Sequence, residues 1–219
     1  KKFRHAPYVY INQSVTTDYR KQFTVTASIE WAESPQPKDP LYGAGLSLQW
    51  QTTNWLNLGL TSNYTFDHSN WGFVSYIDSI DQVIIGRRDS RTVTNDFYMQ
   101  LLFSPHMNFS VHTRHYWSEV KYLQFYNLQD DGNVEPSDFT GNYDINFNAW
   151  NVDVVYAWQF APGSFLNLIW KVNSLNEDQL ITHNYFDNFQ NTLKLPSGNT
   201  VALKMIYYLD YQRIKKVFS

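Results

Sequence analysis

Ser110, His112 and Asp96 are of the types that hydrolases use as nucleophile, base and orienting acid, and all three fall within one predicted hairpin. Ser110 and His112 share one face of a strand, and Asp96 and Tyr98 lie on the strand opposite. The expected register puts Arg114 across from Asp96 and Tyr98 across from His112. The carboxylate is then engaged by the guanidinium, so we predict no catalytic residue and place His112 and Tyr98 in a polar lumen network.

Residue spacing gives little support to metal or cofactor chemistry. The chain has no cysteine, and two of its six histidines, His112 and His115, alternate to opposite faces of a strand and cannot chelate together. The acidic run 130–135 lacks the full spacing of a calcium loop, and we interpret it as a solvated loop. With no glycine-rich phosphate loop either, we predict neither a metal site nor a cofactor.

The charge composition bears on the partners. Seventeen Lys+Arg against twenty Asp+Glu give a net charge of −3, which argues against a nucleic-acid partner because phosphate binding needs a basic surface. Arg87, Arg88 and Arg91 form a small basic cluster. We interpret it as a solvated loop tip, with contact to lipopolysaccharide phosphates as the alternative.

The composition bears on which secondary-structure elements position these residues, and its main feature is a high aromatic content. Aromatic residues make up 18% of the chain and charged residues 17%, and the mean hydropathy is −0.46. No run of about 18 apolar residues occurs, which excludes a transmembrane helix. A transmembrane barrel of alternating residues has a similar mean hydropathy, and membrane interfaces accommodate aromatic rings at low cost.

Helical periodicity is nearly absent, whereas period-two alternation recurs in segments of about ten residues. Eight segments show it: 23–31, 42–51, 56–65, 96–103, 109–114, 150–160, 166–173 and 201–210. One side of these segments carries no Asp, Glu, Lys or Arg, as expected where a charge against lipid would cost roughly 2–4 kcal/mol. The other side carries the charges: Glu30, Asp96, Arg114, Asp153, Lys171, Lys204 and Asp210.

Aromatic residues lie toward the segment ends, as in the interfacial girdles of membrane barrels. The residues expected there are Trp31, Trp50, Trp150, Trp158 and Phe160. Alternation alone leaves open a soluble β-sandwich that buries the same face in its core. The polar side favours the membrane interpretation, because it is rich in Gly, Asn, Gln, Thr and Ser rather than in charge.

Short connections predict the strand register. We expect three-residue hairpin loops at 52–54, 104–106 and 161–163. Opposite residue numbers then sum to 106, 210 and 324, which places Trp50 across from Leu56. The same sums give two ion pairs on the inner face: Asp96 with Arg114, and Asp153 with Lys171.

Long polar segments at about 67–91, 118–146 and 174–198 alternate with the short ones and are expected as outer loops, the first containing strand-like runs that could form a tall hairpin. We predict an all-β fold over residues 1–219, an antiparallel transmembrane β-barrel of outer-membrane type with about nine strands visible. Such barrels have an even strand number and both ends on the periplasmic side. The count therefore predicts the C-terminal part of a larger barrel, with at least one strand upstream of Lys1.

Several segments together resemble one outer-membrane family of Bacteroidota-type bacteria. They are Arg4-His5-Ala6-Pro7, Thr17-Asp18-Tyr19-Arg20-Lys21, the run from Ile85 to Val93, Phe103-Ser104-Pro105, the run from Trp158 to Ser164, and the stretch from Asn199 to Tyr211. The resemblance implies an N-terminal sandwich like a family-nine carbohydrate-binding module, followed by a large barrel of unknown function. It implies an envelope location and a link to glycans, and it supplies no catalytic residues.

The function expected from the sequence is therefore that of an integral protein of the bacterial outer membrane. We expect a porin-like transporter or a scaffold within a larger envelope complex, linked to glycan binding or uptake. Its expected partners are outer-membrane lipid, lipopolysaccharide, and other envelope proteins or the missing N-terminal part of its own chain. A membrane-embedded hydrolase using Ser110 and His112, and a soluble all-β carbohydrate-binding module, are the alternatives.

Overall fold

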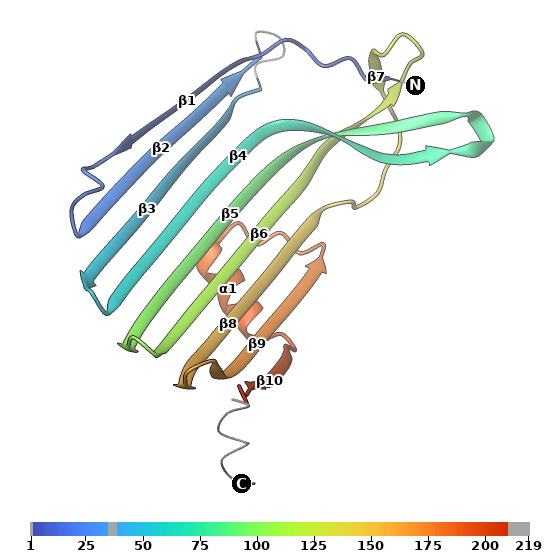
Figure 1. The fold of residues 1–219 in the computed structure, drawn as a ribbon. Coiled ribbons are helices and arrows are strands. Elements are labelled where there is room, and N and C mark those ends of the chain that lie inside the picture. Colours follow the sequence, from blue (N-terminus) through green and yellow to red (C-terminus); the bar gives the residue numbers. More distant parts are fainter. Residues whose placement is uncertain (1, 35–38, 210–219) are drawn as a thin grey trace, which may run out of the picture.

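The protein forms one curved, antiparallel, ten-stranded sheet, seen in a computed structural model that describes residues 2–34 and 39–209 (Figure 1). Nine strands follow one another in chain order, and the short β7 (Val134–Pro136) pairs with β6. The nine are β1 (Val9–Thr16), β2 (Phe23–Glu33), β3 (Leu41–Thr53), β4 (Leu56–Ile77), β5 (Gln82–Ser104), β6 (Met107–Leu128), β8 (Ile145–Ala161), β9 (Ser164–Asp178) and β10 (Gly198–Ile206).

The all-β, antiparallel prediction is confirmed, but the described residues do not close a barrel. β1 and β10 are the two edges of the sheet, and most of their side chains are exposed. No helix of the described chain is both long enough and apolar enough to cross a membrane.

Strand pairing brings the apolar sides of all eight alternating segments onto one face of the sheet. Val25 lies across from Leu48, and Leu48 across from Leu60, which in turn lies across from Phe97. The row continues through Thr113 to Val152 and Val172. We call this side the apolar face and the opposite side the polar face. A register slip by one residue at any strand pair would have mixed the two faces.

Two-residue turns join three strand pairs at one end of the sheet, which we call the turn end; the opposite end is the loop end. The turn residues are Asn54-Trp55, Pro105-His106 and Pro162-Gly163, each beside a bulge. The sums of 210 and 324 hold, with Asp96 across from Arg114 and Asp153 across from Lys171.

The register predicted for the first hairpin is wrong by two residues. Trp50 pairs with Leu58 rather than Leu56, so that opposite residue numbers sum to 108. The cause is the placement of the loop one residue too early. Gln51 and Asn57 form the last regular pair, and the five residues between them match the five in each of the other two hairpins. The faces were still predicted correctly, because a two-residue shift preserves the alternation.

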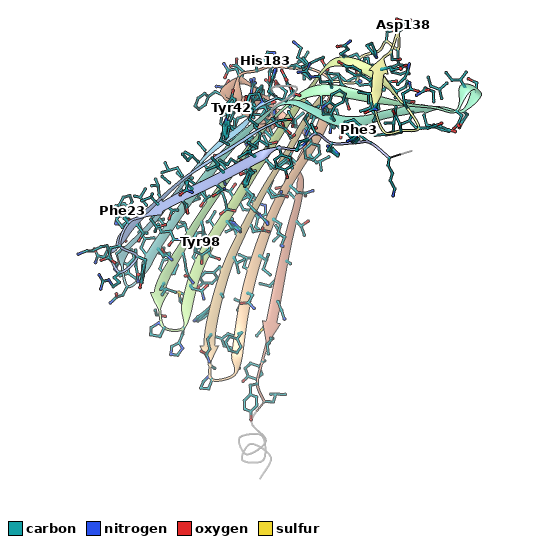
Figure 2. All side chains as sticks on the ribbon, turned by 90° about the horizontal axis from the view of Figure 1, so that it is seen from above. Phe3, Phe23, Tyr42, Tyr98, Asp138 and His183 are labelled. Carbon is teal, nitrogen blue, oxygen red and sulfur yellow. The ribbon has the colours of Figure 1, made fainter. Side chains whose placement is uncertain are left out.

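The loop end differs from the long loops expected there. Segment 67–91 is almost entirely strand, because β4 and β5 extend together as a tall hairpin that turns at η1 (Asp78–Ile80). The connection after β6 spans only 129–144, and the one after β9 spans 179–197 and contains the helix α1 (Tyr185–Lys194). Figure 2 shows Phe3, Tyr42, His183 and Asp138 gathered toward the loop end.

Side chains are buried mainly at two places, under α1 and in the β4–β5 extension. Trp117 is 1% exposed and lies beside α1, and Ile84 is 1% exposed in the extension. Elsewhere the sheet is a single layer. The apolar face is therefore uncovered over much of its area, as at Ile29, which is 65% exposed.

Candidate functional site

A ladder of charged side chains crosses the polar face from β5 to β9. The charged ladder consists of Asp96, His112, Arg114, Asp153 and Lys171. Asp96 Oδ2 lies 2.6 Å from His112 Nε2. Arg114 Nη2 lies 2.8 Å from Asp153 Oδ2, and Lys171 Nζ lies 3.2 Å from Asp153 Oδ1. Four adjacent strands thus contribute to one line in which carboxylates lie beside basic side chains.

One of the two predicted ion pairs has a different partner. Asp96 lies across from Arg114 in the register, as expected, but its carboxylate binds His112 on the same neighbouring strand. Arg114 reaches instead to Asp153 on β8, where a single carboxylate accepts both Arg114 and Lys171. The reason is geometric: diagonal neighbours on a sheet are within reach of long side chains, so directly opposite residues need not pair.

The other residues predicted for the polar network occupy the same face. The ring of Tyr98 lies edge-on to that of His112, with centroids 6.1 Å apart. Lys204 on β10 lies across from Asn167. Asp210 lies outside the described residues.

Asp96 binds His112 rather than Arg114, so the expected guanidinium does not occupy this carboxylate. Asp96 Oδ2 lies against Nε2 of the His112 ring. Ser110 is two residues from His112 along the same strand, across from Gln100. A base must lie about 2.6–3.2 Å from the proton it takes. Within the described chain, no hydrogen bond joins Ser110 to His112, and no group of three or more potential metal ligands is found.

The arginine cluster is engaged within the protein, which contradicts its interpretation as a solvated loop tip. Arg87 binds Asp39 at 2.6 Å. Arg88 donates to Asn70 and to the hydroxyl of Tyr122, and Arg91 binds Glu119 at 3.3 Å.

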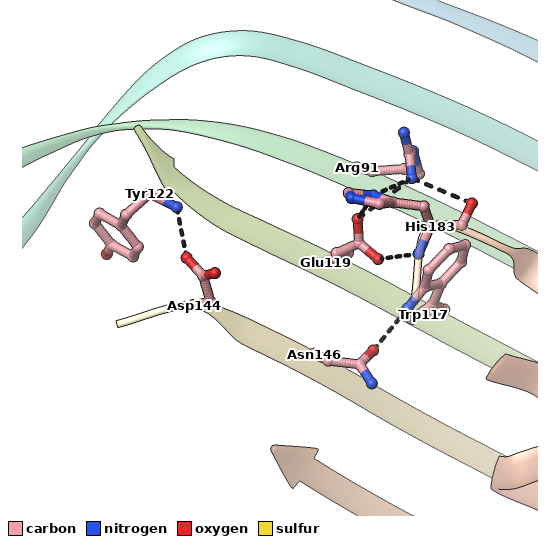
Figure 3. A network of polar contacts seen from close by, with 7 residues as sticks. All are labelled: Arg91, Trp117, Glu119, Tyr122, Asp144, Asn146 and His183. Carbon is pink, nitrogen blue, oxygen red and sulfur yellow. Dashed lines mark hydrogen bonds and ion pairs between the residues drawn. The ribbon is translucent and has the colours of Figure 1, made fainter. Parts of the chain in front are cut away.

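A second polar cluster, which sequence reasoning missed, joins α1 to the apolar face near the loop end (Figure 3). Glu119 is 3% exposed and accepts hydrogen bonds from the backbone N–H of His183 and from Arg91. His183 Nδ1 lies 2.8 Å from Glu119 Oε1. Two residues before Glu119 on β6, Trp117 Nε1 donates to Asn146 Oδ1 on β8 at 2.8 Å. Charges on the apolar face therefore begin where α1 and the segment before it cover the sheet.

A cleft of about 510 Å³ opens at the loop end between the N-terminal arm, β1 to β4 and the loop after β6. Aromatic rings line it, among them Phe3, Tyr10 and Trp71, and the Phe3 and Trp71 centroids are 5.4 Å apart. Arg4 N donates to the carbonyl of Gly132, which holds the arm in place. Burial raises the pKa of the Asp67 carboxyl in the wall, against the hydrogen bond that Asn70 donates at 2.6 Å.

The five aromatic residues predicted for interfaces fall into two groups on the apolar face. Trp50, Trp158 and Phe160 lie near the turn end, while Trp31 and Trp150 lie farther toward the loop end. Trp50, Trp158 and Trp31 are 38–49% exposed. Trp150 Nε1 donates to the hydroxyl of Thr113 at 3.1 Å.

A family model covers residues 1–218, nearly the whole chain. The chain belongs to the family described as a domain of unknown function, DUF5916. Comparisons with curated proteins and with solved structures gave no match. Membership in DUF5916 agrees with the predicted family of unknown function and assigns no role to the charged ladder or to the cleft.

Proposed function

We propose that this DUF5916 chain forms part of the wall of a bacterial outer-membrane β-barrel, with its apolar face against lipid and its polar face toward a water-filled interior. The observation that carries the proposal is the apolar face itself. In its turn-end part, over residues 97–103 of β5, 107–113 of β6 and 150–160 of β8, this face has no charged side chain, and it lies uncovered rather than buried in a second sheet. Water is a poor environment for such a surface, whereas acyl chains are a good one.

The aromatic residues support a membrane boundary at two levels. On β3, Tyr42 and Trp50 share the apolar face eight residues apart, and Trp150 and Trp158 do the same on β8. Eight residues span about 26 Å along a strand at a rise of 3.3 Å per residue. A strand tilt of about 35–45° reduces this to a depth of roughly 18–21 Å, somewhat less than the apolar band of about 25 Å between the girdles of outer-membrane barrels.

The stagger of the turns supports a tilted barrel wall. The row of residues paired with Trp50 crosses β5 at Met99 and β8 at Val154. The turns begin four, six and eight residues beyond this row on β3, β5 and β8. Two strands separate successive turns, so the stagger is one residue per strand. With a strand spacing of about 4.8 Å, a plane through the turns gives a tilt of about 35°, close to that of outer-membrane barrels.

The charged ladder suits an interior surface. Its members are partly exposed, with Lys171 at 60% and Arg114 at 52% side-chain exposure, and Asp96, Arg114, Asp153 and Lys171 alternate in sign. Such a line would give a porin-like channel or a scaffold wall a hydrated, roughly neutral lining. We propose closure by further strands pairing at β1 and β10, from the same chain or from an envelope partner, because open edges do not persist in lipid.

The remaining expectations belong to the same proposal. They are an origin in Bacteroidota-type bacteria, an accompanying carbohydrate-binding-like sandwich, lipid and lipopolysaccharide as surroundings, and a place in an envelope transporter or scaffold complex.

Membrane fractionation tests the proposal. The full-length protein should remain in the outer-membrane fraction after high-salt and carbonate washes and be released only by detergent. On gels it should migrate faster before boiling than after, because a closed barrel resists unfolding by detergent. Release by salt alone, with no heat-dependent change in migration, would favour the soluble β-module instead.

A second candidate function rests on the cleft, whose rings and polar groups are suited to a neutral saccharide. Sugars present apolar ring faces that stack on aromatic residues, with hydroxyls that bind carboxylates and amides. Calorimetry with a panel of neutral oligosaccharides should detect binding that Trp71→Ala abolishes. Trp55→Ala is the matched control, because Trp55 is 52% exposed at a tight turn on the opposite end. Equal binding by both variants would exclude the cleft.

A further inference from the structure

The helix α1 packs on the apolar face of the sheet, at the loop-end border of its uncharged part. Tyr185 at its start accepts a hydrogen bond from Asn95 Nδ2 on β5 at 2.7 Å, and its ring centroid lies 5.9 Å from that of Trp117 on β6. Just after its end, the carbonyl of Pro196 accepts a hydrogen bond from Ser174 on β9. The helix axis therefore crosses the strands from β5 to β9, so the two flanks of the helix face the two ends of the sheet.

The contacts fix which flank faces which end. Phe189 lies against His115, with centroids 4.8 Å apart, whereas Asn188 exchanges amide hydrogen bonds with Asn148. Asn148 lies across from Trp117, two residues farther from the tight turn of β6 than His115. The Phe189 flank therefore faces the turn end and the Asn188 flank faces the loop end.

The two flanks differ in polarity. At 3.6 residues per turn, Phe186 and Leu193 lie on the Phe189 flank, while Asp187 and Asn191 lie on the opposite one. Phe186 is 72% exposed and Leu193 is 47% exposed. The exposed Phe186 and Leu193 thus point along the sheet toward the uncharged part of the apolar face, and Asp187 and Asn191 point away from it.

We infer that α1 lies in the lipid headgroup layer on the outside of the sheet, with Phe186 and Leu193 reaching the ends of the acyl chains. The inference rests on the proposed function, since it requires the apolar face to contact lipid. Helices with one apolar and one polar flank bind at this depth, where apolar side chains enter the boundary region and polar ones stay hydrated. The charges under the helix agree with this level, because Arg91 and Glu119 pair on the loop-end side of His115.

This arrangement also gives α1 a role in setting the depth of the sheet. A helix anchored by the amide pair to Asn148 and by the contact of His183 with Glu119 cannot move along the strands without breaking both. The outer lipid boundary is therefore fixed at the row of Asn95 and His115.

Site-directed spin labelling tests the inference, and because residues 1–219 contain no cysteine, each introduced cysteine is unique within them. The full-length protein is reconstituted in vesicles of phosphatidylethanolamine and phosphatidylglycerol, with one label at Phe186→Cys, Leu193→Cys, Asn191→Cys or Leu168→Cys. Collisions with oxygen report lipid exposure, and collisions with a nickel chelate report water exposure. Leu168, on the apolar face of β9 and 44% exposed, is the reference for the acyl-chain region.

Labels at positions 186 and 193 should show an oxygen-to-nickel ratio several-fold above that at 191, and a depth shallower than that at 168. Water exposure at 186 and 193 equal to that at 191, together with lipid exposure at 168, would overturn the inference and leave the proposed function standing. Water exposure at all four positions would overturn both. Heat-dependent migration on gels verifies that each variant has folded.

Discussion

Asp153 connects the charged ladder, because its two carboxylate oxygens bind two basic side chains from the strands on either side of β8. Arg114 binds Oδ2 at 2.8 Å from β6, and Lys171 binds Oδ1 at 3.2 Å from β9. All three side chains are in contact with solvent, so neither ion pair is expected to contribute much alone. Their value lies in fixing which side chains face one another on the polar face.

A double-mutant cycle measures this coupling. Asp153→Asn, Lys171→Met and the double variant should give a coupling free energy of about 0.2–1 kcal/mol in urea unfolding, because the pair is cross-strand and partly exposed. The control is the same cycle with Lys204→Met in place of Lys171→Met. Lys204 lies across from an amide, Asn167, rather than a carboxylate. A coupling near zero would mean that Arg114 alone satisfies Asp153.

At the scale of elements, Gly86 in β5 leaves room for the ring of Tyr122 on the neighbouring strand β6. A Cβ on Gly86 would overlap the ring of Tyr122, which packs near Phe125 and Tyr143. A Cβ on Gly59 in β4 would meet nothing closer than Tyr98 Cβ at 3.9 Å. Two strand glycines thus have very different surroundings.

Gly86→Ala should therefore destabilise the protein by about 1–3 kcal/mol, through displacement of the ring. Gly59→Ala should be neutral or slightly stabilising, because alanine restricts the unfolded chain. Urea unfolding of both variants provides the measurement. Equal effects would show that the Tyr122 ring moves aside freely.

The helix α1 is the element that sequence reasoning missed, although the sequence holds its signals. Asn184 caps the helix by accepting from the backbone N–H of Phe186 and Asp187, and Lys194 lies in the last turn. Phe186, Phe189 and Leu193 recur at helical spacing. The signal is weak because one short helix lies within a long polar segment between strands.

At the scale of the whole molecule, the two faces of β8 make the proposed membrane placement testable with adjacent residues. Val154 lies on the apolar face and Val155 on the polar face. Val154→Arg should cost roughly 2–4 kcal/mol on insertion into vesicles, whereas Val155→Arg should cost about 1 kcal/mol or less. Folding yield in vesicles, read from heat-dependent migration, gives the comparison. An equal loss from both variants would argue against lipid on one face only.

Much of this sheet followed from the sequence alone. Alternation with period two assigned the side chains of the eight segments to two faces, because a strand turns its side chains to opposite sides and an unpaired charge is costly on a buried or lipid-covered face. Short turns gave the register of two hairpins, which placed Asp153 across from Lys171.

The tertiary structure decided what depends on distances between segments far apart in the chain. Lys171 and Arg114 share Asp153 because three strands meet there, and sequence arithmetic on one hairpin at a time cannot include the third strand. In the same way, the cleft forms where the N-terminal arm reaches Gly132, and α1 lies on one particular face because Asn188 meets Asn148. Local periodicity determines faces, whereas side-chain partners are selected by whichever long side chains the folded sheet brings within reach.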